Sequence, residues 1–160
     1  MLIKDKIKIA WIGGSHSRHL YFLNQINNKF QLIGGILEKR ENSMPEPPDS
    51  ASELDRKNFI RHFKQRDLSE KKYFGNQDIP KINILNVKEN ELNSEKSVQF
   101  INKLNPDLVI IFGCGLIKNP LFHALPVNSI NLHLGLSPRY RGSATLFWPF
   151  YFLEPNMAGT

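Results

Sequence analysis

Apolar positions along the chain follow two patterns that alternate. Short, nearly continuous apolar runs of strand length occupy residues 7–12, 31–37, 82–87, 108–112 and 127–132. Between them, helices are predicted that begin at Ser15 or Ser17, whose side chains could cap the first turn, and that span 94–104 and 119–124. The apolar and aromatic stretch at 143–153 predicts a further helix, which we expect to be buried.

The repeated order of strand, helix and strand predicts a parallel sheet, because parallel neighbours need a crossover connection. The expected fold class is α/β, a Rossmann-like parallel (mixed) sheet with helices on both faces. In such folds ligands bind outside the carboxyl ends of the strands. The ends of the predicted strands are therefore the places to search for a site.

A polar segment at 38–80 interrupts the alternation. Its later part, Glu53 to Phe74, could form a helix, and a connection of this length is often functional. The 160 residues, 41% of them apolar, suffice for one domain over 1–160 that contains this insertion.

The net charge of +6 indicates either an anionic partner or a basic, solvated surface. Nucleic acid, a nucleotide and an acidic surface each remain possible on this ground. Cys114 is the only cysteine, which excludes an intrachain disulfide and suits a reducing cytoplasm. The longest apolar run, 108–114, is too short to span a bilayer, so no membrane partner is expected.

The first strand ends in Gly13-Gly14-Ser15-His16-Ser17-Arg18 and opens into a helix. Free amides and the helix dipole favour an anion there, although a tight turn between strand and helix would have the same sequence. The dinucleotide fingerprint and the P-loop pattern are both absent from this stretch.

The fourth strand ends in Phe112-Gly113-Cys114-Gly115-Leu116-Ile117. Two glycines one residue apart allow the backbone to approach a flat ligand closely, or they simply serve a loop. Cys114 is expected to be a small packed residue rather than a nucleophile.

The fifth strand ends in Asn131-Leu132-His133, whose first and third side chains share a strand face. An amide can donate to a developing oxyanion and an imidazole can move a proton, although both could merely bond to neighbouring loops. Arg139 and Arg141 follow, and they could bind a phosphate or carboxylate or lie in a solvated turn. The histidines show no metal-ligand spacing, so no metal is expected.

These stretches together resemble the folate-dependent formyltransferase family. The resemblance is specific from Pro106 onward, where PDLVIIFGCGLI, INLHLGLSPRYRG and FWPF follow one another in the family's order. Before that point the chain matches only in general layout.

The resemblance implies transfer of a formyl group from N10-formyltetrahydrofolate to a primary amine. It makes Asn131 and His133 the catalytic residues, the asparagine polarising the formyl oxygen and the histidine assisting proton transfer. The implied pterin-holding loop consists of Phe112, Gly113, Cys114, Gly115 and Leu116. The implied substrate-binding residues are Gly14, Ser15, Arg18, Arg139, Tyr140 and Arg141.

The chain departs from the family's pattern in one catalytic group. The family carries an aspartate a few dozen residues beyond the histidine, whereas no aspartate follows Asp107 here. We therefore expect a formyltransferase fragment whose C-terminal part is missing and which is inactive alone. The alternative of another class is a non-catalytic module that binds a nucleotide or folate.

Within the family, the chain looks most like the nucleotide-sugar N-formyltransferases. The features that carry this resemblance are the sequence of Leu134–Pro138, the aromatic run that follows and the insertion. The expected acceptor is then a dTDP- or UDP-linked amino sugar for surface polysaccharide (O-antigen) synthesis, and no nucleic acid is needed. The alternative enzyme is a methionyl-tRNA formyltransferase. A homodimer is also considered, since sugar-modifying relatives often dimerise.

Overall fold

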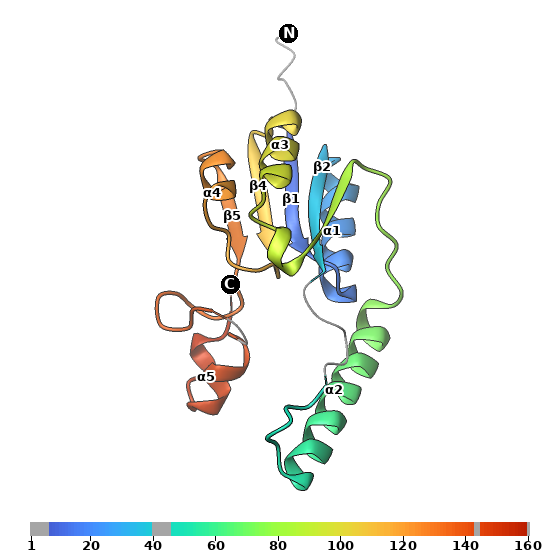
Figure 1. Cartoon of the computed structure of the whole chain (residues 1–160), viewed down its shortest axis with the longest axis vertical. Coiled ribbons are helices and arrows are strands. Elements are labelled where there is room, and N and C mark those ends of the chain that lie inside the picture. The colour runs from blue at the N-terminus through green and yellow to red at the C-terminus, as the bar shows by residue number, and fades with distance from the viewer. Residues whose placement is uncertain (1–6, 40–45, 143–144, 160) are drawn as a thin grey trace.

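The five strands form one sheet in the order β3-β2-β1-β4-β5 (Figure 1). The computed structural model describes residues 7–39, 46–142 and 145–159. All four neighbouring pairs of strands are parallel. The strands are β1 (Ile9–Gly14), β2 (Gly34–Lys39), β3 (Ile84–Lys88), β4 (Leu108–Phe112) and β5 (Ser129–Leu132).

Helices cover both faces of this sheet, as expected. On one face α1 (Ser17–Phe30) packs Leu20 and Leu23 against Trp11 of β1. On the other face α3 (Glu95–Leu104) and α4 (Leu121–Ala124) pack Ile101 and Leu121 against Ile12 and its neighbours. Alternate residues of β1, β2, β3 and β4 therefore enter two separate cores, whereas β5, which the structure describes in full, contributes to neither.

The predicted order of strands and helices along the chain is confirmed, with shifts at several ends. The second strand begins at Gly34 rather than Gln31, and the fifth begins at Ser129 rather than Val127. The N-cap of α1 is His16, without a side-chain cap, so neither serine takes that role. Within the described residues the only antiparallel pairing is an isolated bridge between Gly135 and Ala158, so no antiparallel strand makes the sheet mixed there.

The insertion folds into α2 (Glu53–Phe74), which confirms the helix expected there. This helix projects below the sheet in Figure 1 and buries none of its own residues. It is held against α1 by an ion pair between Arg18 and Glu70 and by a ring contact between Tyr21 and Phe74. None of the described helices is both long enough and apolar enough to cross a membrane.

The expected buried helix at 143–153 is wrong in length and in burial. The helix α5 spans Phe147–Tyr151, and residues 143–144 lie outside the described part of the chain. Phe147 and Phe150 are 54% and 57% exposed, and Pro149 is the buried residue of this helix. The aromatic rings pack mainly on one another, Phe147 on Trp148 and Trp148 on Tyr151, instead of entering the core. Two short 3-10 turns, η1 (Glu89–Glu91) and η2 (Pro155–Met157), complete the fold.

Candidate active site

Three strand ends meet at the carboxyl edge of the sheet. Gly13 of β1 lies opposite Phe112 of β4, and Phe112 lies opposite Leu132 of β5. The next residues along the chain, Gly14, Gly113 and His133, therefore follow one another along this edge. The sheet order changes direction between β1 and β4, which is the place where doubly wound folds bind ligands.

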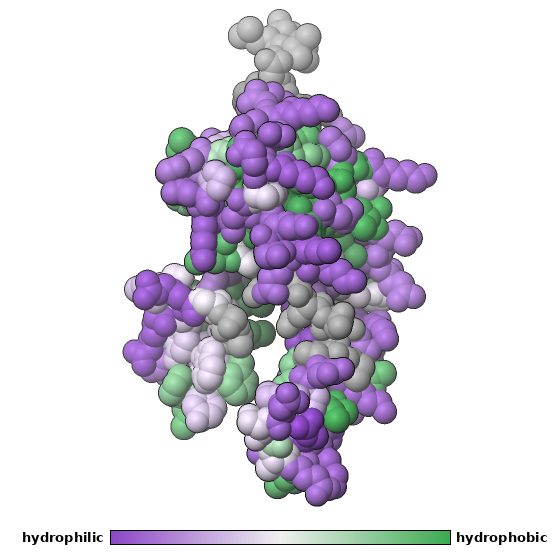
Figure 2. Space-filling model, viewed as in Figure 1, coloured by the Kyte–Doolittle hydropathy of each residue, from purple (hydrophilic) through white to green (hydrophobic). Residues whose placement is uncertain are grey.

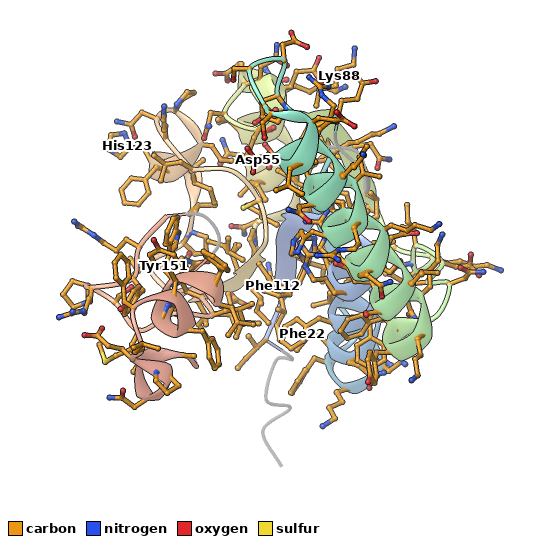
Figure 3. All side chains as sticks on the ribbon, turned by 90° about the horizontal axis from the view of Figure 1, so that it is seen from below. Phe22, Asp55, Lys88, Phe112, His123 and Tyr151 are labelled. Carbon is orange, nitrogen blue, oxygen red and sulfur yellow. The ribbon has the colours of Figure 1, made fainter. Side chains whose placement is uncertain are left out.

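The helices α2 and α5 both lie beyond this edge (Figure 1). The space-filling view in Figure 2 shows a hollow between them, below the sheet. Seen from below in Figure 3, Phe112 lies near the middle, with Tyr151 of α5 to one side and α2 to the other. The strand ends thus face a space that the two helices border.

The buried side chain of His19 lies between the end of β1 and the end of β4. His19 is 4% exposed, and its ring lies edge-on to Phe112 at 5.0 Å. A Cβ atom added at Gly14 or at Gly113 would lie 2.3 or 2.2 Å from the His19 ring, so both glycines are needed to admit it. Burial lowers the pKa of His19 to about 3, and the charges of Arg18 and His16 add to this effect.

His19 is therefore a neutral support of the site, and its role was not predicted from the sequence. The signal that could have found it is the pair of glycines at two neighbouring strand ends. Together they leave room for one bulky side chain from the following helix.

The glycine loop after β4 is held by side chains from distant parts of the chain. Gly115 donates its N–H to Oε2 of Glu38 at 2.5 Å. The Asn93 amide donates to the Leu116 carbonyl at 3.0 Å, and its oxygen accepts from the Lys118 N–H at 2.6 Å. Sequence reasoning missed Glu38 and Asn93, because neither belongs to a motif at the strand ends.

The free side of this loop carries the groups a flat ligand would meet. Gly113 has φ +70°, a left-handed conformation that favours glycine, and the Leu116 side chain is 75% exposed. Cys114 packs against the core that contains α3 and α4, as expected of a small apolar residue. Of the predicted pterin-holding residues, Cys114 is thus packed against the core, whereas Gly113 and Leu116 are exposed.

His133 follows the last residue of β5. Its ring is held by a hydrogen bond to the backbone of Gly135, two residues further along the chain. Nδ1 lies 2.8 Å from the Gly135 carbonyl oxygen. A carbonyl oxygen can only accept, so Nδ1 carries the proton and Nε2 of the neutral ring keeps its lone pair. Asn131 is exposed in β5, opposite Ile111. The site therefore offers an amide donor and an imidazole base near one strand end.

The predicted anion-binding side chains are already partly engaged within the chain. Arg18 pairs with Glu70 of α2, and the two side chains are 30% and 16% exposed. Ser15 lies in the loop that leads to α1 and is half-buried. An anionic ligand at this loop would therefore compete with Glu70 for the guanidinium.

Glu154 holds two other predicted substrate-binding residues. It accepts from Arg139 at 2.6 Å and from the Tyr140 hydroxyl at 2.5 Å. The bond to Glu154 and burial raise the pKa of Tyr140, whose side chain is 6% exposed. Tyr140 thus supports the loop after His133, while Arg141 is exposed. Within the described ranges no group of three or more His, Cys, Asp or Glu could hold a metal ion.

A model of the formyl transferase family matches residues 51–150, and the chain belongs to this family. The match covers β3, β4, β5 and most of α5, and with them the glycine loop and His133. The α/β fold described above is therefore that of a formyltransferase.

Curated relatives match short stretches of the chain. The methionyl-tRNA formyltransferase of Geobacter sulfurreducens is 39% identical over 72 residues, which cover 44% of this chain and 21% of that protein. The enzyme of the same name from Clostridium tetani is 37% identical over 54 residues, 33% of this chain and 17% of that protein. The matched part thus spans about a fifth of the length of these relatives.

Solved structures match over nearly the whole chain. Phosphoribosylglycinamide formyltransferase from Anaplasma phagocytophilum aligns with a TM-score of 0.57 at 15% identity, covering 92% of this chain and 59% of that one. The Streptococcus pneumoniae enzyme of the same name aligns with a TM-score of 0.54 at 15% identity, covering 91% and 67%. At this identity the likeness shows the shared α/β fold.

Proposed function

We propose that this chain takes part in formyl transfer from N10-formyltetrahydrofolate to the amine of a dTDP- or UDP-linked amino sugar, for surface polysaccharide synthesis. The observation that carries the proposal is the bond from His133 Nδ1 to the Gly135 carbonyl. It leaves Nε2 able to accept a proton beside the glycine loop. Membership of the formyl transferase family supports the reaction type.

In this proposal His133 takes the proton that the attacking amine loses as its nitrogen bonds to the formyl carbon. Asn131 donates a hydrogen bond to the formyl oxygen while negative charge develops on it. The bond between that carbon and the donor nitrogen then breaks, and the proton held on Nε2 goes to the leaving nitrogen. Atoms and charge balance without a metal or a redox group.

The glycine loop fits a folate donor, which is the formyl source of this family. The exposed backbone of Gly113 and the exposed Leu116 side chain offer surface to a flat ring. Cys114 and Gly115 would support this face through packing and through the bond to Glu38. The donor supplies the formyl carbon, and these residues hold it next to His133.

The anionic diphosphate of a nucleotide sugar accounts for the cationic groups at the same edge. Arg141 is exposed and Arg139 lies beside it, bound to Glu154. Arg18 lies at the start of α1, where free amides and the helix dipole add to its attraction for an anion. The net charge of +6 is then explained without nucleic acid.

The second candidate is a methionyl-tRNA formyltransferase. It is favoured by the names of the curated relatives and by exposed basic residues along α2, among them Arg61, Lys64 and Lys72. A tRNA ligand would bind with a steep dependence on salt, because cations around its phosphates are released. A nucleotide sugar carries far fewer charges and would show a shallow dependence.

Calorimetry of the whole chain separates these candidates. We expect 5-formyltetrahydrofolate and one of a panel of dTDP- and UDP-linked amino sugars to bind, with no tRNA affinity that falls steeply between 50 and 200 mM salt. These salt concentrations are the usual range for such a test. Failure of the folate and of every nucleotide sugar to bind would sink the proposal.

Transfer is measured in the same samples as the mass gain of the amino sugar. His133→Asn should abolish any transfer and leave folate affinity unchanged, since the substitution removes the proton acceptor and keeps the loop. Binding without transfer by the unaltered chain agrees both with a formyltransferase fragment that is inactive alone and with a non-catalytic binding module, so only observed transfer favours the enzyme over the module.

A further inference from the structure

Glu38 is a buried carboxylate at the end of β2, only 1% exposed. It lies opposite Gly14 of β1 in the sheet. From there the Glu38 side chain reaches past the end of β1 to Gly115 in the loop after β4, where an added Cβ would lie 3.1 Å from its Oε1. There its Oε2 accepts the Gly115 N–H at 2.5 Å, across 77 residues of sequence. One side chain therefore joins the ends of two strands that flank β1.

Asn93 holds the other end of the same loop. Its amide bonds both the Leu116 carbonyl and the Lys118 N–H. Two side chains thus satisfy three backbone groups on the supported side of the loop. The free side, with Gly113 and exposed Leu116, is left to face the carboxyl edge.

We propose that Glu38 is a positioning residue for the formyl donor: through Gly115 it fixes the glycine loop at the distance from His133 that transfer requires. The proposal rests on the proposed function, because it takes this loop as the donor site. It extends that function to Glu38, which the sequence placed at the start of the polar insertion and the structure places in β2.

Two substitutions of Glu38 distinguish the effect of its side-chain length from the effect of its charge. Glu38→Asp keeps the carboxylate and shortens the side chain by one methylene, about 1.5 Å, so the bond to Gly115 is lost. Glu38→Gln keeps the length and leaves a neutral oxygen that still accepts the Gly115 N–H. A positioning role predicts that the glutamine variant resembles the wild type and the aspartate variant does not.

The first readout is the affinity of the whole chain for 5-formyltetrahydrofolate by calorimetry. We expect Glu38→Asp to weaken binding by about tenfold and Glu38→Gln by less than about threefold. Asn93→Ala, which releases the other end of the loop, is the matched variant and should weaken binding to a similar degree. Equal affinity of the wild type and Glu38→Asp for the folate would overturn the proposal.

The second readout is hydrogen exchange of the Gly115 amide, which needs no ligand. Exchange should accelerate by about tenfold or more in Glu38→Asp and stay slow in Glu38→Gln. Unchanged exchange in Glu38→Asp would show that the bond to Gly115 does not hold the loop, and this also overturns the proposal. If the wild type itself fails to bind folate, the donor function fails, whereas the exchange rates still report the bond. If the aspartate variant unfolds, Asn93→Ala still tests whether folate binding needs the loop to be held: unchanged folate affinity in Asn93→Ala would then overturn the proposal.

Discussion

At the scale of single residues, His19 shows how the site edge is assembled. A glycine at the end of β1 and another after β4 make room for one imidazole from α1. Because the ring is buried, its charged form is disfavoured, and its pKa falls to about 3. The folded protein therefore binds this proton less readily than the unfolded chain does.

The free energy of unfolding should depend on pH through His19. The folded-state pKa lies below the ordinary value of 6.5, so the contribution is complete above pH 6.5 and is lost as pH falls from there toward 3. The slope should approach about 1.4 kcal/mol per pH unit in this window. Urea denaturation at pH 7 and pH 5 measures it. His19→Asn should lose this slope, whereas His123→Asn, a change at an exposed histidine, should keep it; equal slopes in all three proteins would contradict the assignment.

The Gly135 carbonyl sets the tautomer of His133, and Gly135 is tightly enclosed. An added Cβ would lie 2.5 Å from the Thr145 carbonyl oxygen and 2.9 Å from the Tyr140 Cβ. We expect Gly135→Ala to lower the free energy of unfolding by about 1–3 kcal/mol, measured by urea denaturation. Ser137→Ala, an exposed change nearby, should alter it by less than about 0.5 kcal/mol. A Gly135→Ala protein as stable as this control would show that the loop after His133 adapts freely.

At the scale of elements, α2 is attached by its C-terminal half. Glu70 pairs with Arg18, Phe74 contacts Tyr21, and Asn24 donates to Gln77 and to the Asp78 carbonyl just beyond the helix. Since α2 contributes no buried residue, its attachment and the stability of the sheet should be separable.

Glu70→Ala should release α2 without unfolding the sheet. We expect trypsin to cleave within α2 several-fold faster, while the free energy of unfolding changes by less than about 1 kcal/mol, because the ion pair is partly exposed. The matched control is Glu53→Ala, whose pair with Lys57 lies on the exposed surface of α2 alone. Cleavage at the same rate in both variants would mean that Glu70 does not hold the helix.

The helix α5 shows what an apolar pattern leaves undetermined. The sequence predicted a buried helix there because Phe147, Trp148 and Phe150 are apolar. Hydrophobicity indicates that a segment favours burial, but the surface that would cover it lies elsewhere in the chain. In the described structure Phe147 packs on Trp148 and Trp148 packs on Phe152, and the side chains of Phe147, Trp148 and Phe150 remain exposed. The prediction of α2, by contrast, did not depend on a covering surface, because this helix buries none of its residues.

At the scale of the whole molecule, the parallel α/β sheet followed from the alternation of patterns, whereas the strand order β3-β2-β1-β4-β5 was not predicted. Parallel strands bring their carboxyl ends to one edge, so the motifs that contain Gly14, Gly113 and His133 were expected at that edge. The supports of the site could not be predicted in this way. The bonds from Glu38 to Gly115 and from Asn93 to Lys118 join loops that no periodicity relates. The residues that we propose to meet a ligand are therefore easier to predict from the sequence than the side chains that hold the loops.

The central claim is that the edge formed by the glycine loop and His133 binds a formyl-folate. Titration of the isotope-labelled whole chain with 5-formyltetrahydrofolate, followed by amide and imidazole NMR shifts, tests it most directly. We expect saturable shifts at Gly113, Leu116 and the His133 ring, with α2 beyond Glu70 unaffected. No saturable shift at these positions, or shifts confined to α2 or α5, would contradict it.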